Sequence, residues 1–526
     1  MLIQDYLLNS AERYPDSPVL LYDKKTITYS RLAMAAWSVA DWLCSMHLDR
    51  GFRAAILTED PFEYFAAYFA AIMAGGLALG LNSQTSRRSL SYYLNDSKAS
   101  VLFTNGKYIK ILKQTIKDVS GLGHICISGK NVPEHLHEAS CEDFSGLLER
   151  QVDSGRFQLP WRSSCDIAQI IYTSGTTGNP KGVMLSHSSL DANTRSIIEY
   201  LQICHDDRVM AVLPFFYSYG NSIMLTHVAA GASLSVNQNF MYPNMILEQM
   251  KEHEVTGLSG VPSTFSILLH RSALNNYSFP VLRYITQAGA PMSPSVAFEL
   301  QKKFPGVKIF IMYGQTEASA RLSYLPPEDL ERKPGSIGKP IPGVELQLLD
   351  ANGSPVLQGK TGEIVARGEN IMSGYWRRPE ETAKVLRQEG LWTGDLAYKD
   401  SDGYLYIVSR KSDIIKSGAH RIGPQEIEDV IMEHGTVSEV AVIGIPDEIL
   451  GEKIKACVVL KKGQKCTVKE LRKHCRAILP AYKVPHTIEF LPDLPKTSTG
   501  KIKRSALRDR QEESISCLSL SKAINS

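Results

Sequence analysis

Before Gly335, short apolar runs that favour β-strands alternate with longer segments of helical pattern. We expect strands at Ser100–Thr104, Arg208–Leu213 and Lys308–Met312, and a helix at Pro294–Phe304 before the last of them. Regular alternation of strands and helices is typical of α/β layers. The first part of the chain is therefore predicted to be a multi-layer α/β structure.

The pattern changes after Gly335, where strands follow one another with turns between them. Strands are expected at Glu345–Leu349 and Gly362–Arg367, separated by turn residues such as Asn352 and Gly353. This spacing predicts a small β subdomain.

A helix is predicted to start at Pro424, because proline is favoured in the first turn of a helix. This helix opens a new structural unit. The unit then continues with strands at Glu439–Ile443 and Lys453–Leu460, a helix at Val468–Ile478 and a strand at Thr487–Leu491. A unit of this size can fold on its own.

The predicted fold class is α/β, with a large N-terminal domain over residues 1–409 and its β subdomain at about 335–409. A small α+β C-terminal domain is expected over residues 413–510, joined through residues 410–412 and followed by a flexible tail at 511–526.

One stretch, Phe65–Leu81, carries no charge but is too short for a membrane span and contains three glycines. It is better explained by a buried helix ending at Gly75 and Gly76, followed by a buried strand at Leu77–Leu81. We therefore expect no integral membrane segment. The start of the chain lacks the basic and apolar regions of a signal peptide.

Composition excludes several classes of protein. Of 526 residues, 43% are hydrophobic and 21% charged, which is ordinary for a globular protein. The net charge of +3 gives no case for nucleic acid or an anionic membrane as the main partner. Nine scattered cysteines without a C-x-x-C pair indicate free thiols and a cytoplasmic location.

The strongest chemical signal is a loop of Gly, Ser and Thr residues from Thr173 to Pro180, followed by Lys181. Its backbone N–H groups, hydroxyls and cation are what a polyphosphate requires. A P-loop NTPase would instead place G-K-[S/T] at the start of a helix. Here Gly182 follows the lysine, and both flanks, Ile167–Tyr172 and Val183–Leu185, favour strands. The loop is expected to join two strands.

With the segments after it, this loop resembles the signature motifs of the adenylate-forming superfamily. That superfamily includes acyl- and aryl-CoA synthetases, adenylation domains of peptide synthetases and firefly luciferase. Five further motifs follow in the family's order: Ala288-Gly289-Ala290-Pro291, Tyr313-Gly314-Gln315-Thr316-Glu317, Trp392-Thr393-Gly394-Asp395, Arg410 through Glu428, and Pro495-Lys496-Thr497 through Gly500-Lys501-Ile502.

The resemblance implies that ATP activates a carboxylic acid to an acyl-adenylate, after which a thiol displaces AMP. Lys501 would offset the charge repulsion between carboxylate and phosphate, Thr316 would contact phosphate, and Glu317 would bind Mg²⁺. Ser412 lies at the family's hinge position, so the C-terminal domain is expected to be mobile. Asp395 would accept hydrogen bonds from both ribose hydroxyls, and Arg410 would lie near the ribose or phosphate. The other implied nucleotide-binding residues are Thr173, Ser174, Gly175, Thr176, Thr177, Gly178 and Lys181 in the phosphate loop, Ala288, Gly289 and Ala290 in the adenine segment, Tyr313, which would stack on adenine, and Gly314.

The implied acid pocket contains Tyr217, Ser218 and Asn221 and has no carboxylate to pair with an ammonium group. Free amino acids should therefore be rejected, and an uncharged fatty or aryl acid is predicted. Two positions depart from the family pattern. Tyr217 stands where many CoA ligases have histidine, and Ala419 replaces a glycine near the expected thiol tunnel.

The leading interpretation is a stand-alone acyl-CoA ligase that uses ATP, Mg²⁺ and CoA in fatty acid metabolism. The nearest alternative loads the phosphopantetheine arm of a separate acyl carrier protein. A luciferase-like oxidoreductase and a non-catalytic nucleotide-binding protein are weaker alternatives. His187 and His270 have no partners at catalytic or metal-ligand spacing and are interpreted as structural.

Overall fold

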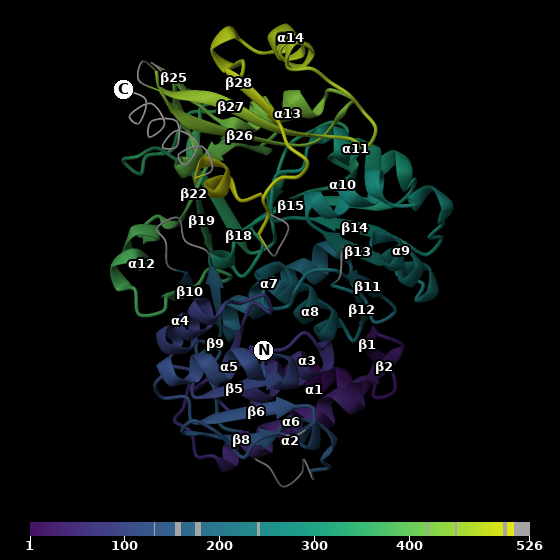
Figure 1. Cartoon of the computed structure of the whole chain (residues 1–526), viewed down its shortest axis with the longest axis vertical. Coiled ribbons are helices and arrows are strands. Elements are labelled where there is room, and N and C mark those ends of the chain that lie inside the picture. Colours follow the sequence, from purple (N-terminus) through teal and green to yellow (C-terminus); the bar gives the residue numbers. More distant parts are fainter. Residues whose placement is uncertain are drawn as a thin grey trace, which may run out of the picture.

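The computed structural model describes residues 1–130, 132–152, 159–173, 180–238, 242–417, 420–447, 450–497 and 502–509, except for the side chains of residues 412 and 421. In this part of the chain, two large sheets form the N-terminal body and a smaller third sheet lies beside them. A fourth sheet forms the C-terminal domain at the top of Figure 1. The expected α/β architecture with a smaller C-terminal domain is confirmed.

The first large sheet carries helices on both faces, because alternate residues of its central strands point to opposite sides. Ala54 and Ile56 pack with helices α2, α3 and α6, whereas Ala55 and Leu57 pack with α4 and α5. The strand order is β20 (Gly374–Tyr375), β10 (Lys181–Ser186), β9 (Ile167–Thr173), β4 (Leu77–Gly80), β3 (Arg53–Leu57), β5 (Val101–Asn105), β6 (His124–Ser128), β8 (Ala139–Asp143) and β7 (His135–Leu136).

The second large sheet has a parallel centre and antiparallel edges. Its strand order is β17 (Lys339–Pro340), β16 (Ser323–Leu325), β15 (Lys308–Tyr313), β14 (Tyr284–Gln287), β13 (Gly257–Gly260), β11 (Arg208–Ala211), β12 (Ser233–Val236), β1 (Pro18–Tyr22) and β2 (Lys25–Thr28).

The helices of the N-terminal domain lie mainly between these strands in the sequence. They are α1 (Gln4–Arg13), α2 (Tyr29–Ser45), α3 (Pro61–Met73), α4 (Arg87–Ser97), α5 (Ile109–Thr115), α6 (Phe144–Glu149), α7 (His187–Leu201), α8 (Ser218–Ala230), α9 (Pro243–Glu252), α10 (Pro262–Arg271), α11 (Pro294–Lys303) and α12 (Pro379–Val385).

Helix α3 and strand β4 account for the long uncharged run. Asp60 caps the helix by accepting from the backbone N–H groups of Phe62 and Glu63, and the helix is buried along nearly its whole length. The expected buried helix and buried strand are confirmed. No helix within the described ranges is long and apolar enough to cross a membrane.

The third sheet is antiparallel and corresponds to the expected β subdomain. Its strand order is β18 (Val344–Leu349), β19 (Gly362–Gly368), β22 (Gly390–Lys399) and β21 (Leu386–Arg387), and β23 (Leu405–Arg410) also pairs with β22. The short strand β20 leaves this region and pairs with β10 of the first sheet. This pairing brings the segment after Gly374 to the base of the phosphate loop.

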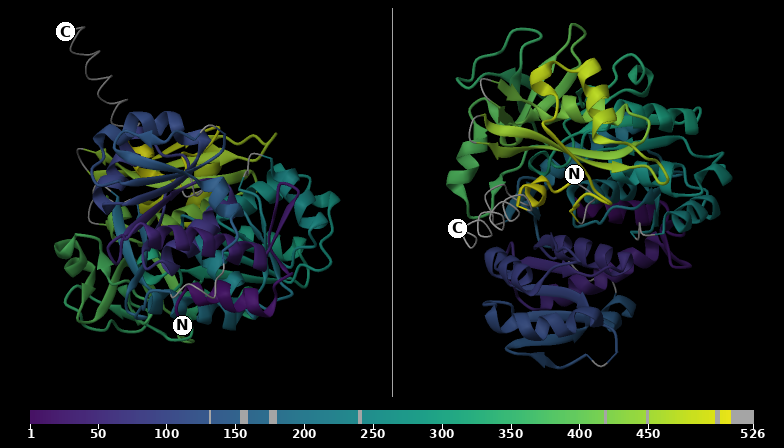
Figure 2. Two further views of the ribbon diagram at one scale, coloured as in Figure 1. Left: turned by 90° about the horizontal axis from the view of Figure 1, so that it is seen from below. Right: turned by 45° about the horizontal axis from the view of Figure 1, so that its top comes forward.

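The C-terminal domain is a sheet covered by helices α13 (Pro424–Met432) and α14 (Val468–Ile478) (Figure 2). Helix α13 also packs against β23, so the domain lies against the third sheet. The strand order is β25 (His420–Ile422), β24 (Ile415–Ser417), β27 (Gly451–Leu460) and β26 (Val437–Asp447), with β28 (Thr487–Phe490) parallel to β27.

Candidate active site

A buried carboxylate, Asp395, lies at the centre of the site. The hydroxyl of Tyr313 donates to Asp395 Oδ2 at 2.7 Å, and Arg410 Nε donates to Oδ1 at 2.9 Å. Asp395 is 3% exposed, whereas the Arg410 side chain is half exposed. Strands β15, β22 and β23 therefore bring together three residues that are far apart in the sequence.

Tyr313, Asp395 and Arg410 form the Asp395 cluster, whose carboxylate can accept further hydrogen bonds. A carboxylate has about four lone-pair positions, and the two protein donors use one on each oxygen. Burial, followed by the negative charge of Asp395, raises the pKa of Tyr313, so its hydroxyl stays protonated as a donor. Asp395 is thus suited to accept from two neighbouring hydroxyls of a ligand.

Thr316 and Glu317 follow β15 in a short 3₁₀ turn. Thr316 Oγ1 donates to Ser218 Oγ at 3.1 Å, and the Tyr375 hydroxyl donates to Glu317 Oε1 at 2.8 Å. Glu317 also contributes to the raised pKa of Arg410, so the two side chains lie within electrostatic reach. A carboxylate at this position suits a hard cation such as Mg²⁺.

Lys181 begins strand β10, directly after the phosphate loop. Its ammonium forms an ion pair with Glu381, and it lies 5.1 Å from the centre of the Tyr375 ring. Tyr375 therefore connects the lysine of the loop with Glu317. Residues Ser174, Gly175, Thr176, Thr177 and Gly178 of the loop lie outside the described residues.

The described base of the phosphate loop is held by neighbouring side chains. Thr173 pairs with Lys181 across the β9–β10 hairpin, as expected for a loop between two strands. The Tyr92 hydroxyl donates to the carbonyl oxygen of Pro180 at 2.7 Å, and the Tyr172 hydroxyl donates to Asp96 at 2.6 Å.

The expected adenine segment follows β14. Gln287 Nε2 donates to the carbonyl oxygen of Ala290 at 2.7 Å, which closes the turn that contains Ala288 and Gly289. Gly289 has φ +93°, a conformation that favours glycine. Gly314 is required for a different reason, because a Cβ there would lie 2.1 Å from the Ala320 carbonyl oxygen.

The expected acid-pocket residues lie around the start of α8. Tyr217 precedes the helix, and Ser218 accepts the hydrogen bond from Thr316. Asn221 is buried, and its amide exchanges two hydrogen bonds with Gln169, at 2.9 and 3.2 Å. The space beside Gly257 is filled by the Tyr284 ring, because a Cβ on Gly257 would lie 2.1 Å from that ring. Glycine at position 257 therefore lets the Tyr284 ring pack directly against the backbone of β13.

The expected catalytic Lys501 lies outside the described residues, as does the side chain of Ser412. The segment that follows Lys501 is anchored through Arg504, whose Nη2 donates to both carboxylate oxygens of Glu428 at 2.7 and 2.8 Å. Asp413 and Arg410 also act on the pKa of Arg504. This segment therefore lies within electrostatic reach of the Asp395 cluster.

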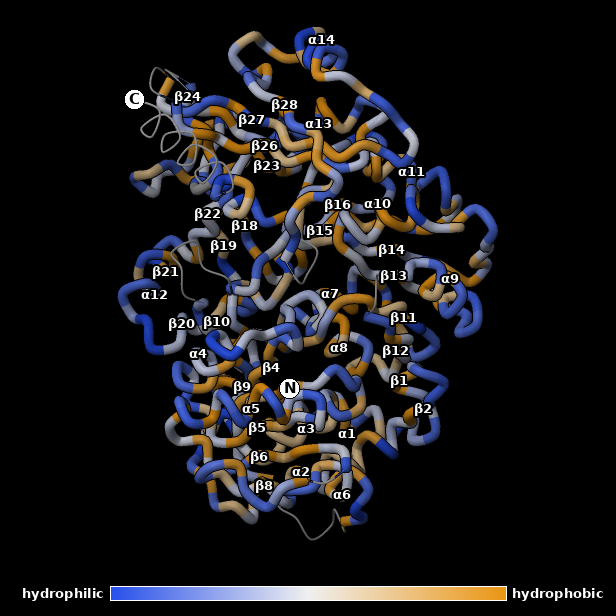
Figure 3. The backbone as a smooth tube through the Cα atoms, in the orientation of Figure 1, coloured by the Kyte–Doolittle hydropathy of each residue, from blue (hydrophilic) through white to orange (hydrophobic). Residues whose placement is uncertain are grey.

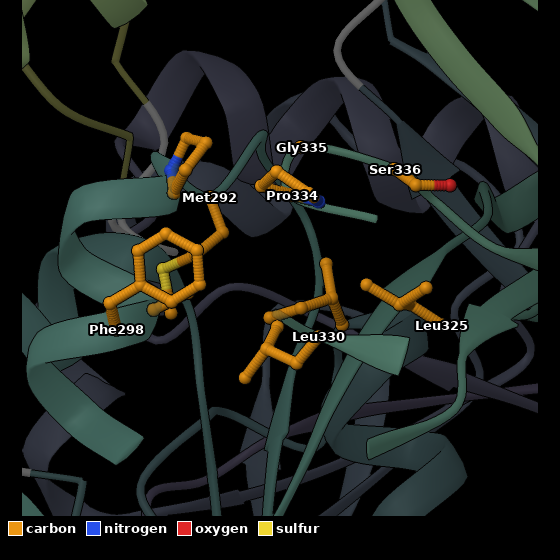
Figure 4. A pocket seen from close by; sticks show the side chains of 10 residues that line it. Met292, Phe298, Leu325, Leu330, Pro334, Gly335 and Ser336 are labelled. Atoms are coloured by element: carbon orange, nitrogen blue, oxygen red, sulfur yellow. The ribbon is translucent and has the colours of Figure 1, made fainter. Parts of the chain in front are cut away.

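Two hollows accompany these residues. A groove of about 440 Å³ lies along β20 and α12, beside Tyr375 and Arg378. A second, apolar hollow between α11 and β15 has a volume of only about 10 Å³, so it holds one water at most. Its side chains, including Met292, Phe298 and Leu330, close around it (Figure 4).

The two histidines interpreted as structural lie away from this cluster. His187 is buried and its Nδ1 accepts from the backbone N–H of Ile3 at 3.1 Å. Burial lowers its pKa to about 4. His270 Nδ1 lies 3.6 Å from Glu299. No group of three or more metal-ligating side chains occurs in the described ranges.

Tyr375, Glu381 and Arg504 were not among the residues expected from the sequence. Tyr375 lies in the short strand β20 and Glu381 in the following helix α12, and the β10–β20 pairing brings them to the loop. Arg504 is adjacent to Lys503 in a basic stretch, where nothing in the sequence distinguishes it.

Comparison with known proteins gives consistent results over nearly the whole chain. The family model described as AMP-binding enzyme matches residues 7–376, and that of the AMP-binding enzyme C-terminal domain matches residues 426–501. A long-chain-fatty-acid–CoA ligase of Bacillus subtilis (strain 168) is 32% identical over 535 residues, which cover 97% of this chain and 95% of the relative.

Solved structures show the same similarity. An anthranilate–CoA ligase in complex with anthranoyl-AMP has a TM-score of 0.91 at 26% identity, covering 98% of both chains. The o-succinylbenzoate–CoA synthetase of Bacillus subtilis in complex with ATP and magnesium ion has a TM-score of 0.81 at 29% identity, covering 96% of this chain and 98% of the other.

Proposed function

Because this chain belongs to the AMP-binding enzyme family, we propose that it activates an uncharged fatty or aryl acid with ATP and transfers the acyl group to CoA. It is an AMP-forming acid–thiol ligase. The observation that best supports this proposal is the buried carboxylate of Asp395, which accepts hydrogen bonds from Tyr313 and Arg410. Glu317 lies within electrostatic reach of Arg410. This combination suits a ribose, whose hydroxyls donate to a carboxylate, next to a polyphosphate that carries Mg²⁺.

In the first half-reaction, a carboxylate oxygen of the acid attacks the α-phosphorus of ATP and pyrophosphate leaves. Asp395 orients the ribose by accepting from its hydroxyls, and Thr316 donates to phosphate. Glu317 would hold Mg²⁺, which would supply positive charge to neutralise the phosphate groups. Lys501 is proposed to offset the repulsion between the two anions.

In the second half-reaction, the thiol sulfur attacks the acyl carbonyl carbon, AMP leaves with the bonding electron pair, and the thiol proton is released. The two half-reactions need different groups around the same carbonyl. The C-terminal domain, residues 413–510, is proposed to turn about residues 410–412 between them, with Ser412 as the pivot. Strand β23 ends at Arg410 and the next sheet starts at Ile415, which supports this location of the hinge.

The nature of the acid is supported by the residues around α8. The segment from Phe216 to Ser222 has no carboxylate that could pair with the ammonium group of an amino acid. An unpaired buried ammonium costs several kcal/mol, so a neutral acyl or aryl group is favoured. The names of the relatives include both a long-chain fatty acid and anthranilate, which agrees with this class.

Free CoA is the proposed acceptor, with a separate carrier protein as the alternative. The relatives named as CoA ligases favour CoA. Ala419, which lies outside the described residues, would narrow the thiol tunnel, and this weakens the assignment of free CoA without removing it. A cytoplasmic location remains a prediction from cysteine use; the eight cysteines in the described ranges are all free.

The test is ATP–pyrophosphate exchange across fatty acids of increasing chain length, benzoates and the common amino acids. We expect exchange with fatty or aryl acids and none with amino acids, and Glu317→Gln as a control should lose the exchange. AMP release with CoA is then compared with release in the presence of a phosphopantetheinylated carrier protein. Preferred turnover of an α-amino acid would refute the proposed substrate class.

A further inference from the structure

A short segment between β19 and α12 contacts both the turn that contains Glu317 and the strand that follows the phosphate loop. At its start, the Met372 backbone N–H donates to the carbonyl oxygen of Glu317 at 2.9 Å. At its end, the Trp376 backbone N–H donates to the carbonyl oxygen of Gly182, on β10, at 2.7 Å. We call residues 372–376 the connecting segment. It ties the proposed metal ligand to the base of the loop through the backbone.

The side chain of Tyr375, in the connecting segment, reaches both of these neighbours. Its hydroxyl donates to Glu317 Oε1 at 2.8 Å, and the carboxylate can only accept. The Lys181 ammonium lies over the Tyr375 ring, 5.1 Å from its centre, which is within the range of a cation–π contact. Tyr375 is 7% exposed. One buried tyrosine therefore contacts the proposed metal ligand through its hydroxyl and the lysine of the loop through its ring.

Backbone contacts on two sides fix the place of this side chain. Tyr375 pairs with Val183 in the β10–β20 ladder, and its backbone N–H donates to Thr382 Oγ1 of α12 at 2.9 Å. A Cβ on Gly374, which has φ +137°, would lie 2.9 Å from the Thr382 side chain, so α12 packs directly against the connecting segment. In Figure 3, α12 is a largely hydrophilic segment at the edge of the molecule, next to β20 and β10.

The hydrogen bond from Tyr375 engages one oxygen of the Glu317 carboxylate and leaves the other available. Glu317 Oε2 has no hydrogen-bond or ion-pair partner within the part of the chain that the structure describes. A glutamate without a partner samples several rotamers, whereas one held at Oε1 presents Oε2 in a defined direction. Groups that orient a metal ligand in this way raise metal affinity, and their loss typically costs about 10–100-fold.

We propose that Tyr375 is a positioning residue, whose hydroxyl orients Glu317 toward the divalent cation of the nucleotide and whose ring holds Lys181 for phosphate. This inference rests on the proposed function, because Glu317 has a cation to bind only if the chain binds a metal–nucleotide complex. The two contacts come from separable parts of one side chain. Phenylalanine removes the hydroxyl and keeps the ring, whereas leucine removes both.

The experiment measures cation binding in the absence of turnover. Free Mn²⁺ is followed by electron paramagnetic resonance in the presence of the full chain and α,β-methylene-ATP, without acid or CoA. Tyr375→Phe should weaken Mn²⁺ binding about 10–100-fold. Calorimetry in EDTA should show unchanged affinity of Tyr375→Phe for the metal-free analogue. Tyr375→Leu should lower that affinity as well, about threefold or more, because Lys181 loses its ring contact.

The matched control is Tyr22→Phe, which removes the same hydrogen bond at a distant place. Tyr22 is 3% exposed, and its hydroxyl donates to Asp60 Oδ1 at 2.9 Å. Its strand, β1, lies near the opposite edge of the second sheet from β15, which leads into the Glu317 turn. This variant should bind Mn²⁺ with the affinity of the unmodified protein.

A double-mutant cycle tests whether the hydroxyl acts through the carboxylate. In the Glu317→Gln background, where Mn²⁺ binding is already weakened, Tyr375→Phe should cause no further loss. A tyrosine that only supports the fold would instead weaken binding in both backgrounds and lower the affinity for the metal-free analogue.

Three results would overturn the inference: unchanged Mn²⁺ affinity in Tyr375→Phe, an equal loss in Tyr22→Phe, or a further loss when Tyr375→Phe is added to Glu317→Gln. Equal weakening of the analogue with and without metal in Tyr375→Phe would also overturn it. If the unmodified protein binds no Mn²⁺ with the analogue, the proposed function fails and this inference fails with it. Normal binding by the unmodified protein and by Tyr375→Phe alike would refute the inference alone.

Discussion

The ion pair between Arg504 and Glu428 allows a sharp test of how the C-terminal segment is positioned. The Glu428 side chain is 8% exposed and accepts two hydrogen bonds from Arg504, at 2.7 and 2.8 Å, and one from the Val442 backbone N–H at 2.7 Å. In Arg504→Met, the carboxylate stays buried with one neutral donor.

The cost of that change can be bounded from the burial of the two side chains. Breaking a fully buried pair by removing one partner costs about 3–5 kcal/mol. Arg504 is 23% exposed, so the lower end of that range, about 3 kcal/mol, applies. If no other contact compensates, the fraction of molecules in which the segment after Lys501 is held in place falls by about two orders of magnitude.

Lys501 lies three residues before Arg504, so adenylate formation should fall far more than thioester formation from pre-made acyl-adenylate. Pyrophosphate exchange measures the first step, and single-turnover reaction of synthetic acyl-adenylate with CoA measures the second. Arg508→Met is the matched control, because Arg508 is 3.5 Å from Asp413 in a more exposed pair worth at most about 1 kcal/mol.

A second variant separates positioning from misfolding. Adding Glu428→Gln to Arg504→Met removes the orphaned buried charge and should recover part of the lost stability, measured by urea unfolding. Full exchange activity in Arg504→Met, or equal loss of both half-reactions, would refute the positioning role.

The remaining predictions concern four single substitutions. Lys501→Ala should lose adenylate formation by several orders of magnitude and retain most thioester formation; equal loss in both would make the lysine structural. Ser412→Pro fixes φ near roughly −65° and should preserve one half-reaction while blocking the other, and normal rates in both would place the hinge elsewhere. Asp395→Asn replaces the carboxylate that is proposed to accept from the ribose hydroxyls by a neutral amide; a hydrogen bond to a charged group is worth about 1.5–3 kcal/mol, so the KM for ATP in the exchange assay should rise at least tenfold, and an unchanged KM would exclude the ribose role. Burial raises the pKa of Asp429 to about 7, so the native state binds more protons than the unfolded state between pH about 4 and 7. The free energy of unfolding should therefore fall as pH rises through that window, by up to roughly 4 kcal/mol, and Asp429→Asn should flatten this dependence in urea titrations.

Much of the fold could be predicted from local pattern. Helix α14 has the predicted bounds, Val468–Ile478, and strands β26, β27 and β28 overlap the three strands predicted for the C-terminal domain, whereas β24 and β25 were not predicted. Strand β26 continues to Asp447, beyond the predicted end at Ile443, because its hairpin partner β27 pairs with it along the whole length. Pairing between strands extends an element past the point where its own sequence pattern ends.

The sequence by itself determined the class of chemistry of this protein, because its glycine-rich loop and each of its polar motifs are contiguous in the chain. It proposed Tyr313, Glu317, Asp395 and Arg410 individually as site residues, and it predicted the hairpin that joins Thr173 to Lys181. Only the tertiary structure decided how they combine: Tyr313 and Arg410 both donate to Asp395, and Tyr375 joins Glu317 to Lys181. Such contacts join residues up to about two hundred positions apart, and a single sequence records the residue types but not the distances between them.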